Sequence, residues 1–183
     1  ITVESALDGR RRNLERLPVY PADHVFPVES RWEKWALTRH LERTERAADG
    51  DVAYLEMRTL ASGITLGYAA TTIASVEPTR SGWTLEDERV TWRAAFPGGP
   101  LRLDKIVHIG TSRDVDAVSP VREGCLDGLE AATAAGFDAI VAASAAAWEE
   151  RWDDCDCTVD DDPAVTQALR FGVYHLLIAA NDA

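Results

Sequence analysis

The sequence has few of the residues that staple a secreted domain or that bind a polyanion. It contains three cysteines in 183 residues, an odd number without a framework spacing, which argues against a disulfide-rich secreted domain and for a reducing compartment. Basic residues are scarce as well, because 19 Lys and Arg stand against 31 Asp and Glu and give a net charge of −12. Nucleic acid and anionic membranes both require a basic surface, so we expect neither as a partner.

Long hydrophobic runs and targeting signals are also missing. No apolar run reaches the roughly 18 residues of a membrane-spanning helix, and no signal peptide is recognisable, so we expect a cytoplasmic protein. Both ends nevertheless have the character of cut ends. Ile1 leads directly into a strand-like segment, and Asn181 follows directly on an apolar helix pattern. We therefore expect an internal piece of a larger protein.

Familiar catalytic signatures are absent from the sequence. There is no Gly-x-Ser-x-Gly, no phosphate-binding glycine loop, no His-Glu-x-x-His and no Gly-x-Gly-x-x-Gly. The segment Cys155-Asp156-Cys157 lies far from all four histidines in sequence, and two thiolates make only half of a zinc site, so we expect no metal. Carboxylates cluster late in the chain and can be compared with the acid–base pair of a glycosidase. A solvated helix end is the simpler interpretation of this cluster, which consists of Glu149, Glu150, Asp153 and Asp154.

Charge is unevenly distributed along the chain. Residues 1–46 contain nine Lys and Arg against eight Asp and Glu, a net of +1, which leaves −13 for the remainder. The one basic run, Arg10-Arg11-Arg12, is flanked by Asp8 and Glu15. This flanking favours a solvated turn over a phosphate clamp.

The first two thirds of the chain have the period of β-strands. Apolar and small polar residues alternate over 64–71, 90–96 and 101–109, the last with Leu103, Val107 and Ile109 on one face. Pro97-Gly98-Gly99-Pro100 joins two of these strands and predicts a hairpin. Many short strands with turn signals between them indicate a β-sandwich whose strands each bury one face.

Near residue 117 the period becomes helical. Ser119 and Pro120 predict the start of a first helix and Gly136 its end, while Asp138 is a candidate cap of a second. Asp162 and Pro163 predict the start of a third helix, which runs to about residue 180 and carries two apolar stripes. We thus predict an α+β fold in which an antiparallel sandwich precedes helices.

Six tryptophans are the most informative aromatic residues. Trp92, inside a clean alternation, is expected in the core, and Trp148 and Trp152 at i and i+4 are expected to pack between helix and sheet. Trp32 and Trp35 instead lie among charged residues directly after an irregular, proline-rich segment at 15–30. Because indoles stack on sugar faces, these two residues are the candidate substrate-binding surface, with core packing as the alternative.

Several segments in order carry a family resemblance. They are Leu7-Asp8-Gly9, Leu103-Asp104-Lys105-Ile106-Val107, Ala147-Trp148-Glu149-Glu150-Arg151-Trp152, Gln167-Ala168-Leu169-Arg170-Phe171 and Tyr174-His175-Leu176-Leu177. Together they resemble glycoside hydrolase family 65, which contains maltose, kojibiose and trehalose phosphorylases and α-glucoside hydrolases. One departure is Asp161-Asp162, where the family often has Gly-Asp.

The resemblance implies an arrangement of domains and a chemistry. It places the later part of an N-terminal β-sandwich at 1–117, a helical linker at 118–161 and the first helix of an (α/α)6 barrel at 162–183. The implied reaction is inverting cleavage of an α-glucoside by phosphate or water, with a catalytic glutamate beyond residue 183 and no catalytic residue in this chain. No metal or organic cofactor is needed, and inorganic phosphate is the co-substrate if the enzyme is a phosphorylase. The implied partners are an α-glucoside disaccharide or oligosaccharide, with a homodimer left open.

Two other functions stay open from the sequence. One is a stand-alone carbohydrate-binding β-sandwich that uses Trp32 and Trp35 without catalysis. The other is a structural piece that serves only for dimer contacts. The third helix favours the enzyme, because a self-contained module has no reason to end on a helix that is apolar nearly all round.

Overall fold

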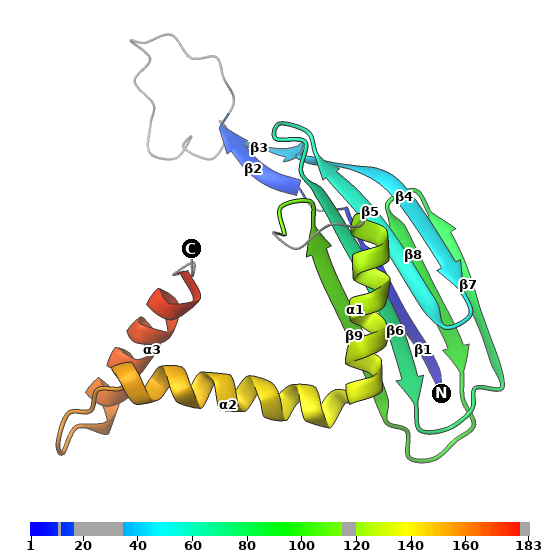
Figure 1. Cartoon of the computed structure of the whole chain (residues 1–183). Coiled ribbons are helices and arrows are strands. Elements are labelled where there is room, and N and C mark those ends of the chain that lie inside the picture. The colour runs from blue at the N-terminus through cyan, green and yellow to red at the C-terminus, as the bar shows by residue number, and fades with distance from the viewer. Residues whose placement is uncertain (11, 17–34, 115–119, 180–183) are drawn as a thin grey trace, which may run out of the picture. The chain divides into compact units, whose positions relative to one another are not determined.

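The computed structural model describes residues 1–10, 12–16, 35–114 and 120–179 (Figure 1). The chain divides into two compact units, Ile1–Ala134 and Ala135–Ala183, and each is considered by itself.

The strands of the first unit form three antiparallel sheets. The four-stranded sheet has the order β4 (Leu41–Asp49), β5 (Val52–Thr59), β6 (Thr65–Ala74) and β9 (Leu103–Thr111). The three-stranded sheet has the order β1 (Thr2–Asp8), β8 (Arg89–Ala95) and β7 (Arg80–Glu86). A separate two-stranded hairpin pairs β2 (Arg12–Arg16) with β3 (Trp35–Arg39).

The two larger sheets face each other across an apolar core, as the predicted sandwich requires. Leu55 and Met57 of β5 are 1% and 0% exposed and pack against Leu7 of β1 and Val90 of β8. Trp92 is also buried, at 7% exposure, and its ring meets that of Phe96 at a centroid distance of 6.2 Å. The predicted core position of Trp92 is therefore confirmed.

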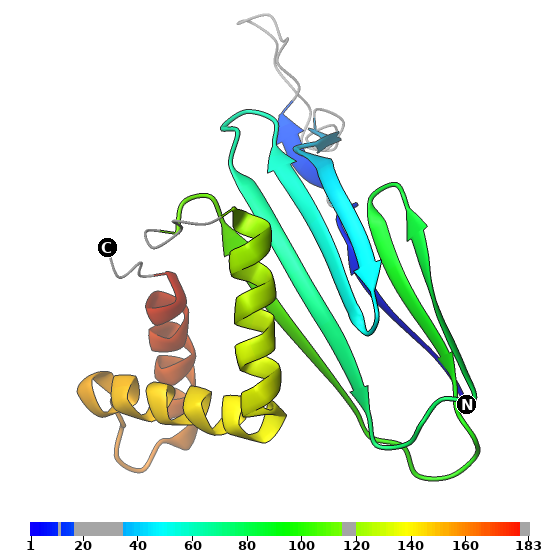
Figure 2. The same ribbon diagram turned by 45° about the vertical axis from the view of Figure 1, so that its right-hand side comes forward.

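The other face of the four-stranded sheet is covered by helix α1 (Val121–Ala135), as Figures 1 and 2 show. Cys125 and Leu129 of the helix are buried against Tyr54 of β5, Ala69 of β6 and Ile106 of β9. Because strand residues alternate between faces, Tyr54 points to the helix while its neighbour Leu55 points into the sandwich. Strands β5 and β6 of the four-stranded sheet are thus buried on both faces, whereas the sequence predicted strands that bury only one.

Helix α1 lies close to the sheet because two facing strand positions are glycine. Gly67 and Gly110 are cross-strand partners on β6 and β9. A Cβ at Gly67 would lie 2.7 Å from the Cys125 sulfur, and one at Gly110 would lie 2.9 Å from it. Both distances are shorter than any real contact of a Cβ atom. Glycine at these positions is therefore required for the helix to pack at this depth.

Two features of β9 differ from the prediction, both for topological reasons. Pro97-Gly98-Gly99-Pro100 is not a hairpin turn, because it connects β8 in one sheet to β9 in the other. Val107 and Ile109 lie on the sandwich side of β9, as predicted, but they are 40% and 59% exposed, whereas Ile106 on the opposite face is buried at 4%. The cause is that α1 covers the face of Ile106, while the three-stranded sheet has no strand opposite β9 among the described residues.

The second unit contains helices α2 (Phe137–Cys155) and α3 (Pro163–Ala179). Gly136 has a φ of 84° and separates α1 from α2, as its predicted role as a stop requires. Asp138 is not the cap of α2, because the N-cap is Gly136 and no side chain caps it. Asp162 does cap α3, since its Oδ1 accepts a 3.0 Å hydrogen bond from the Val165 N–H. Ser119, the predicted cap of α1, lies outside the described residues.

Aromatic side chains connect the two helices of the second unit. The Trp148 ring lies 5.3 Å from the Tyr174 ring of α3, and the Arg151 guanidinium lies 5.9 Å above the same indole. Trp148 and Trp152 are only partly buried, and no residue of α2 is fully buried. The prediction that both indoles are enclosed therefore holds only in part, and the aromatic neighbour of Trp148 belongs to a helix rather than to a strand.

Helix α3 exposes both of its apolar stripes within the described residues. None of its residues is buried. Phe171 is 66% exposed, Leu176 73% and Ile178 51%. A salt bridge of 2.5 Å between Arg170 and Asp156 fixes α3 to the C-cap of α2. The helix is therefore held to α2 by polar contacts and by the contact of Tyr174 with Trp148, while most of its apolar surface is exposed within its own unit.

No single helix in the described part of the chain is long and apolar enough to cross a membrane. Only α1 and α2 taken together, as a bent pair, reach that length and composition. Helix α1 is the core helix of the first unit, because Cys125 and Leu129 are buried in its contact with the sheet.

Candidate functional site

The described residues with the densest polar chemistry lie at the end of the sandwich where β1 leads towards the β2–β3 hairpin. Three arginines from β3 and β4 reach Glu86, the last residue of β7, and the turn of Asp87 and Glu88 between β7 and β8. We call these residues the arginine clasp, and it consists of Arg39, Arg43, Arg46, Glu86, Asp87 and Glu88. Its side chains tie the four-stranded sheet and the hairpin to the three-stranded sheet.

The central contact of the clasp is the ion pair of Arg39 and Glu88. Nη2 of Arg39 lies 2.5 Å from Oε1 of Glu88, whose side chain is only 8% exposed. Nε of the same guanidinium donates a 2.8 Å hydrogen bond to the Leu41 carbonyl. Arg39 is the last residue of β3, so this double contact fixes the base of the hairpin to the body of the sandwich.

The other two arginines reach the turn because β4 contains a β-bulge. The register shifts between Arg43 and Glu45, so that Arg43 pairs with Met57 and Arg46 with Leu55. Cross-strand partners share a face, and both partners belong to the sandwich core. Without the bulge, residues three positions apart would point to opposite faces.

These two arginines hold the turn by different groups. Nη2 of Arg43 lies 2.9 Å from a carboxylate oxygen of Asp87. Nη1 of Arg46 donates to the main-chain carbonyl of Glu86. The turn is therefore held by its backbone and by two of its side chains.

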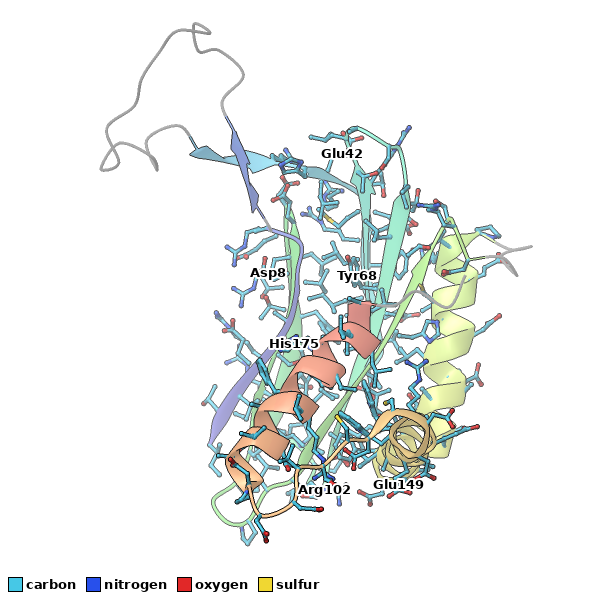
Figure 3. The ribbon with its side chains drawn as sticks, turned by 90° about the vertical axis from the view of Figure 1, so that its left-hand side faces the viewer. Asp8, Glu42, Tyr68, Arg102, Glu149 and His175 are labelled. Carbon is cyan, nitrogen blue, oxygen red and sulfur yellow. The ribbon has the colours of Figure 1, made fainter. Side chains whose placement is uncertain are left out.

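A second group of charges continues along the outer face of β1 and β8. Asp8 pairs with Arg10 at 2.5 Å, and Glu4 accepts hydrogen bonds from Arg89 at 2.7 Å and Arg93 at 2.8 Å. Asp8 lies where β1 leads towards the hairpin (Figure 3). The exposed pairing of Arg10 with Asp8 agrees with the predicted solvated turn.

The arginines hold these carboxylates in the ionised form. Hydrogen bonds from Arg10 lower the pKa of Asp8 to about 2. Arg93 lowers the pKa of Glu4, and Arg43 lowers that of Asp87, in each case chiefly by hydrogen bonding. A general acid needs a pKa near the working pH. The pKa values of these three carboxylates are shifted in the opposite direction, away from that range.

One of the two predicted binding residues lies in the hairpin that this clasp anchors. Trp32 lies outside the described residues, and Trp35 is the first residue of β3, with its side chain outside the description. Three residues separate Trp35 from the anchored Arg39. The segment predicted as an irregular loop, 15–30, falls mostly outside the described residues as well, with residues 15 and 16 at the end of β2.

Sequence reasoning missed the clasp itself. The only feature of the sequence that pointed to it was the net charge of +1 over residues 1–46. No structural role was predicted for these basic residues. The partners of Arg39, Arg43 and Arg46 are 40 or more residues away, and the bulge that orients two of them follows no local motif.

The late acidic residues lie on the surface of the second unit. Glu149, Glu150, Asp153 and Asp154 are all exposed on α2, as expected of a solvated helix end. Within the described parts of the chain, no group of three His, Cys, Asp or Glu side chains is placed to hold a metal ion. Cys155 donates a 3.0 Å hydrogen bond from its thiol to the Arg151 carbonyl, and Cys157 is exposed.

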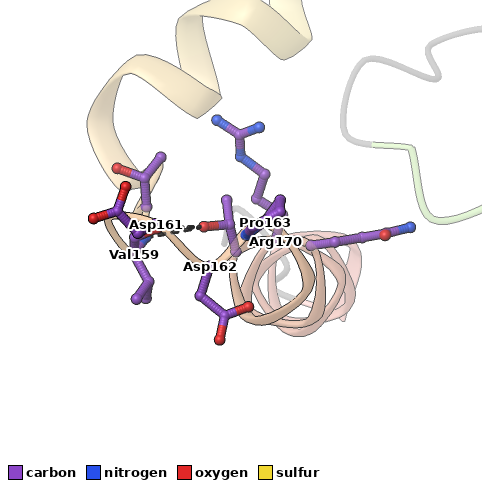
Figure 4. A pocket seen from close by; sticks show the side chains of 8 residues that line it. Val159, Asp161, Asp162, Pro163 and Arg170 are labelled. Atoms are coloured by element: carbon purple, nitrogen blue, oxygen red, sulfur yellow. Dashed lines mark hydrogen bonds between the residues drawn. The ribbon is translucent and has the colours of Figure 1, made fainter.

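A hollow of about 480 Å³ lies at the start of α3 (Figure 4). Several of its polar groups are used within the turn itself. Asp162 caps the helix, the Thr166 hydroxyl accepts a 2.9 Å hydrogen bond from the Val159 N–H, and Arg170 pairs with Asp156. The hollow is therefore shaped by the contacts that begin α3.

Comparison with known proteins points to glycosyl hydrolases, both by a family model and by individual relatives. The model of a protein family described as glycosyl hydrolase family 65, N-terminal domain, matches residues 1–151. Two proteins of Mycobacterium tuberculosis, from strains CDC 1551 and H37Rv, are each 33% identical to this chain over 84 residues. A protein of Mycobacterium leprae (strain TN) has the same identity over the same length. All three bear the name uncharacterized glycosyl hydrolase.

The matched segment is a small part of those relatives. It covers 46% of this chain but only 11% of each Mycobacterium tuberculosis protein and 10% of the Mycobacterium leprae protein. The chain thus corresponds to about a tenth of the length of proteins whose names refer to glycosyl hydrolysis.

Proposed function

Because the chain belongs to glycosyl hydrolase family 65 and contains the N-terminal domain of that family, we propose that it is a non-catalytic front part of an inverting enzyme that cleaves α-glucosides. The observation that carries the proposal is the match of the family's N-terminal domain over residues 1–151. The names of the mycobacterial relatives support a glycosidase as the parent.

The proposed arrangement assigns a role to each part of the chain. Residues 1–117 form the later part of the sandwich, residues 118–161 link it to the next domain, and residues 162–183 begin a helical barrel. The exposed apolar stripes of α3 support this assignment, because the remaining helices of a barrel would cover them. The match to the N-terminal domain ends at residue 151, before α3 begins at Pro163.

The proposed chemistry lies outside these 183 residues. A glutamate of the barrel protonates the leaving oxygen, and phosphate or an activated water attacks the anomeric carbon from the opposite face. Neither reaction requires a metal or an organic cofactor, and phosphate acts as co-substrate in the phosphorolytic case. The chain contributes a rigid support and, at the hairpin, a surface for the glucoside.

The proposed contact with the substrate is made by Trp32 and Trp35. The support for this role is that Arg39, at the end of β3, is fixed twice to the sandwich, so a ligand bound beside the hairpin would meet a preorganised surface. Replacing both tryptophans by alanine in the parent enzyme should raise KM for the glucoside and leave kcat nearly unchanged. Trp148→Phe, in a helix of the other unit, is the control and should leave both constants unchanged. An unchanged KM in the double variant would remove this role from the proposal.

The proposal is tested by comparing the isolated chain with the parent protein. Each is incubated with maltose, kojibiose and trehalose, with and without inorganic phosphate, and released glucose and glucose 1-phosphate are measured. We expect turnover by the parent on at least one disaccharide and none by the 183-residue chain. Clear turnover by the chain alone would contradict its non-catalytic role, and a parent inactive on every α-glucoside would contradict the substrate class.

A further inference from the structure

One sheet of the sandwich has four described strands and the other has three. The smaller sheet therefore leaves an open position beside its edge strand β1. Strand β1 lies across the core from β5 and β6, and its Ser5 hydroxyl accepts a 3.3 Å hydrogen bond from Thr72 of β6. Strand β9 lies beyond β6 in the larger sheet, so it overhangs the edge of β1. Among the described residues, no strand lies beside β1 on that side.

The main chain of β1 has unpaired groups at this edge. Ile1 and Phe96 exchange both main-chain hydrogen bonds, and the Gly9 N–H donates to the Glu88 carbonyl. In an antiparallel pair this pattern assigns the odd residues of β1 to β8 and directs the even ones to the free edge. Thr2 and Glu4 therefore present main-chain N–H and C=O groups that no described residue bonds.

The underside of β9 supplies an apolar roof over the same position. Val107 and Ile109 point to the sandwich side, as their cross-strand partners Ala70 and Tyr68 show, yet they are 40% and 59% exposed. Tyr68 lies on the inner side of the sheet (Figure 3), where burial raises the pKa of its phenol. Free backbone groups below an apolar roof are what an added β-strand requires.

Lys105 limits how far such a strand can pair. Its ammonium group reaches from β9 and donates a 2.8 Å hydrogen bond to the Ala6 carbonyl, and burial lowers its pKa. Lysine in this role protects an edge from indiscriminate pairing. The open stretch is thus the part of β1 around Thr2 and Glu4.

A second copy of this chain does not fit the open position. If its β1 paired with this β1 in the same orientation of the sandwich, its own β6 would occupy the space of β9. If the second copy were instead rotated so that its outer face pointed towards β9, its charged residues Glu4, Arg89 and Arg93 would lie against apolar side chains of the first copy, Val107 and Ile109. Only a strand without a second layer above it can enter.

We propose that the edge of β1 receives a single β-strand from another part of the parent polypeptide, apolar at every second residue, which packs beneath Val107 and Ile109. Only the source of the strand rests on the proposed function. The mycobacterial relatives are about ten times as long as the segment they share with this chain, so a parent of that kind has ample sequence to supply it.

Hydrogen exchange of the β1 amides, measured residue by residue in the isolated chain and in the parent, tests the proposal. In the isolated chain the amides of Val3, Ser5 and Leu7 should be protected, and those of Thr2 and Glu4 should exchange rapidly. In the parent, Thr2 and Glu4 should slow by at least about 100-fold, because a paired amide exchanges only on opening. The odd residues, bonded to β8 in both proteins, are the internal control.

Two outcomes would overturn the proposal. Rapid exchange of Thr2 and Glu4 in the parent would show that no strand binds there, and slow exchange already in the isolated chain would show that the edge is covered within these residues. Neither outcome depends on catalysis, and an active parent with an open β1 edge would refute this inference alone.

A matched pair of variants provides a second readout. Ile109→Lys should lower the melting temperature of the parent more than that of the isolated chain. The new charge would be buried against the added strand in the parent, whereas it would stay in solvent in the isolated chain. Leu60→Lys, at a comparably exposed apolar residue in the β5–β6 turn, should affect both proteins equally. Equal effects of Ile109→Lys in the two proteins would contradict the proposal.

Discussion

The two units of this chain differ in where their apolar residues lie. In the first unit, Leu55, Met57 and Val90 are at most 1% exposed between two sheets, and Leu129 is 2% exposed beneath a helix. In the second unit, neither helix has a buried residue, and Leu176 is 73% exposed. Similar apolar patterns in the sequence therefore give buried side chains in the first unit and exposed side chains in the second. A pattern is satisfied only where the chain itself supplies the opposing surface.

The same contrast appears at the level of the charges. The first unit uses its arginines to join segments that are far apart in sequence, as in the pairing of Arg39 with Glu88. The described charges of the second unit act locally, as in the capping of α3 by Asp162 and the pairing of Arg170 with Asp156. Stability of the first unit is therefore expected to depend on long-range contacts that truncation would remove.

The comparison is sharpest for one leucine in each unit. Leu55→Ala should lower the free energy of unfolding by about 2–5 kcal/mol, because it leaves a cavity between the sheets. Leu176→Ala should change it by less than about 0.5 kcal/mol, because that side chain is already in solvent. Urea denaturation of both variants of the isolated chain, followed by circular dichroism, makes the measurement. Similar losses in the two variants would mean that α3 is covered after all.

Substitutions at two glycines of the first unit compare a tightly packed position with an open one. Gly67→Ala should cost about 1–3 kcal/mol, because the new methyl group would collide with Cys125, Val121 and the Tyr54 hydroxyl. Gly82→Ala, where no atom lies within 4 Å of the added carbon, should be neutral or stabilise by about 0.4–1 kcal/mol. Thermal denaturation of the two variants should therefore shift in opposite directions or by clearly different amounts. A tolerated Gly67→Ala would mean that α1 does not pack at the depth described.

A pair of carboxylates in the clasp gives a smaller effect. Glu88→Gln should cost about 1–2 kcal/mol, because the charge-assisted contact with Arg39 is lost at a buried side chain. Asp87→Asn should cost less than about 0.5 kcal/mol, since its side chain is 76% exposed. Chemical denaturation reports both values. An equal response would show that the clasp is a set of surface pairs without a buried centre.

The smallest expected effect is a dependence of stability on acid pH. The pKa of Asp8 is lowered in the folded state from 3.8 to about 2, so its contribution is present above pH 3.8 and is lost as the pH falls towards 2. Glu4 and Asp87 act in the same direction, because their pKa values are lowered as well. Asp8→Asn should flatten the decline of unfolding free energy in this window and leave its value near pH 7 only slightly reduced. A steeper decline in the variant would reverse the assigned sign.

Local patterns in the sequence predicted local structure well. Asp162 and Pro163 begin α3, Gly136 separates two helices, and the alternation around Trp92 belongs to a core strand. In each case the determining contacts lie within a few residues, so periodicity and capping rules suffice. The sandwich as a class followed from the same alternation repeated over several strands.

The predictions that needed long-range information were wrong or absent. A turn such as Pro97–Pro100 has the same composition whether it joins strands of one sheet or of two. Val107 and Ile106 alternate on β9, and the sequence contains no sign that a later helix would cover the second and leave the first exposed. The arginine clasp depends on a bulge in β4 and on a turn about 40 residues away, neither of which has a local signature.

Native-state hydrogen exchange of the isolated chain, at a dilution where it sediments as a monomer, tests the central contrast most directly. The central claim is that the first unit supplies its own core and the second requires a surface from elsewhere in the parent. We predict that amides of β5, β6 and β8 exchange only on global unfolding, whereas amides of α3 exchange far faster. If the amides of α3 were as slow to exchange as those of β5, the second unit would be complete by itself and the account would be contradicted.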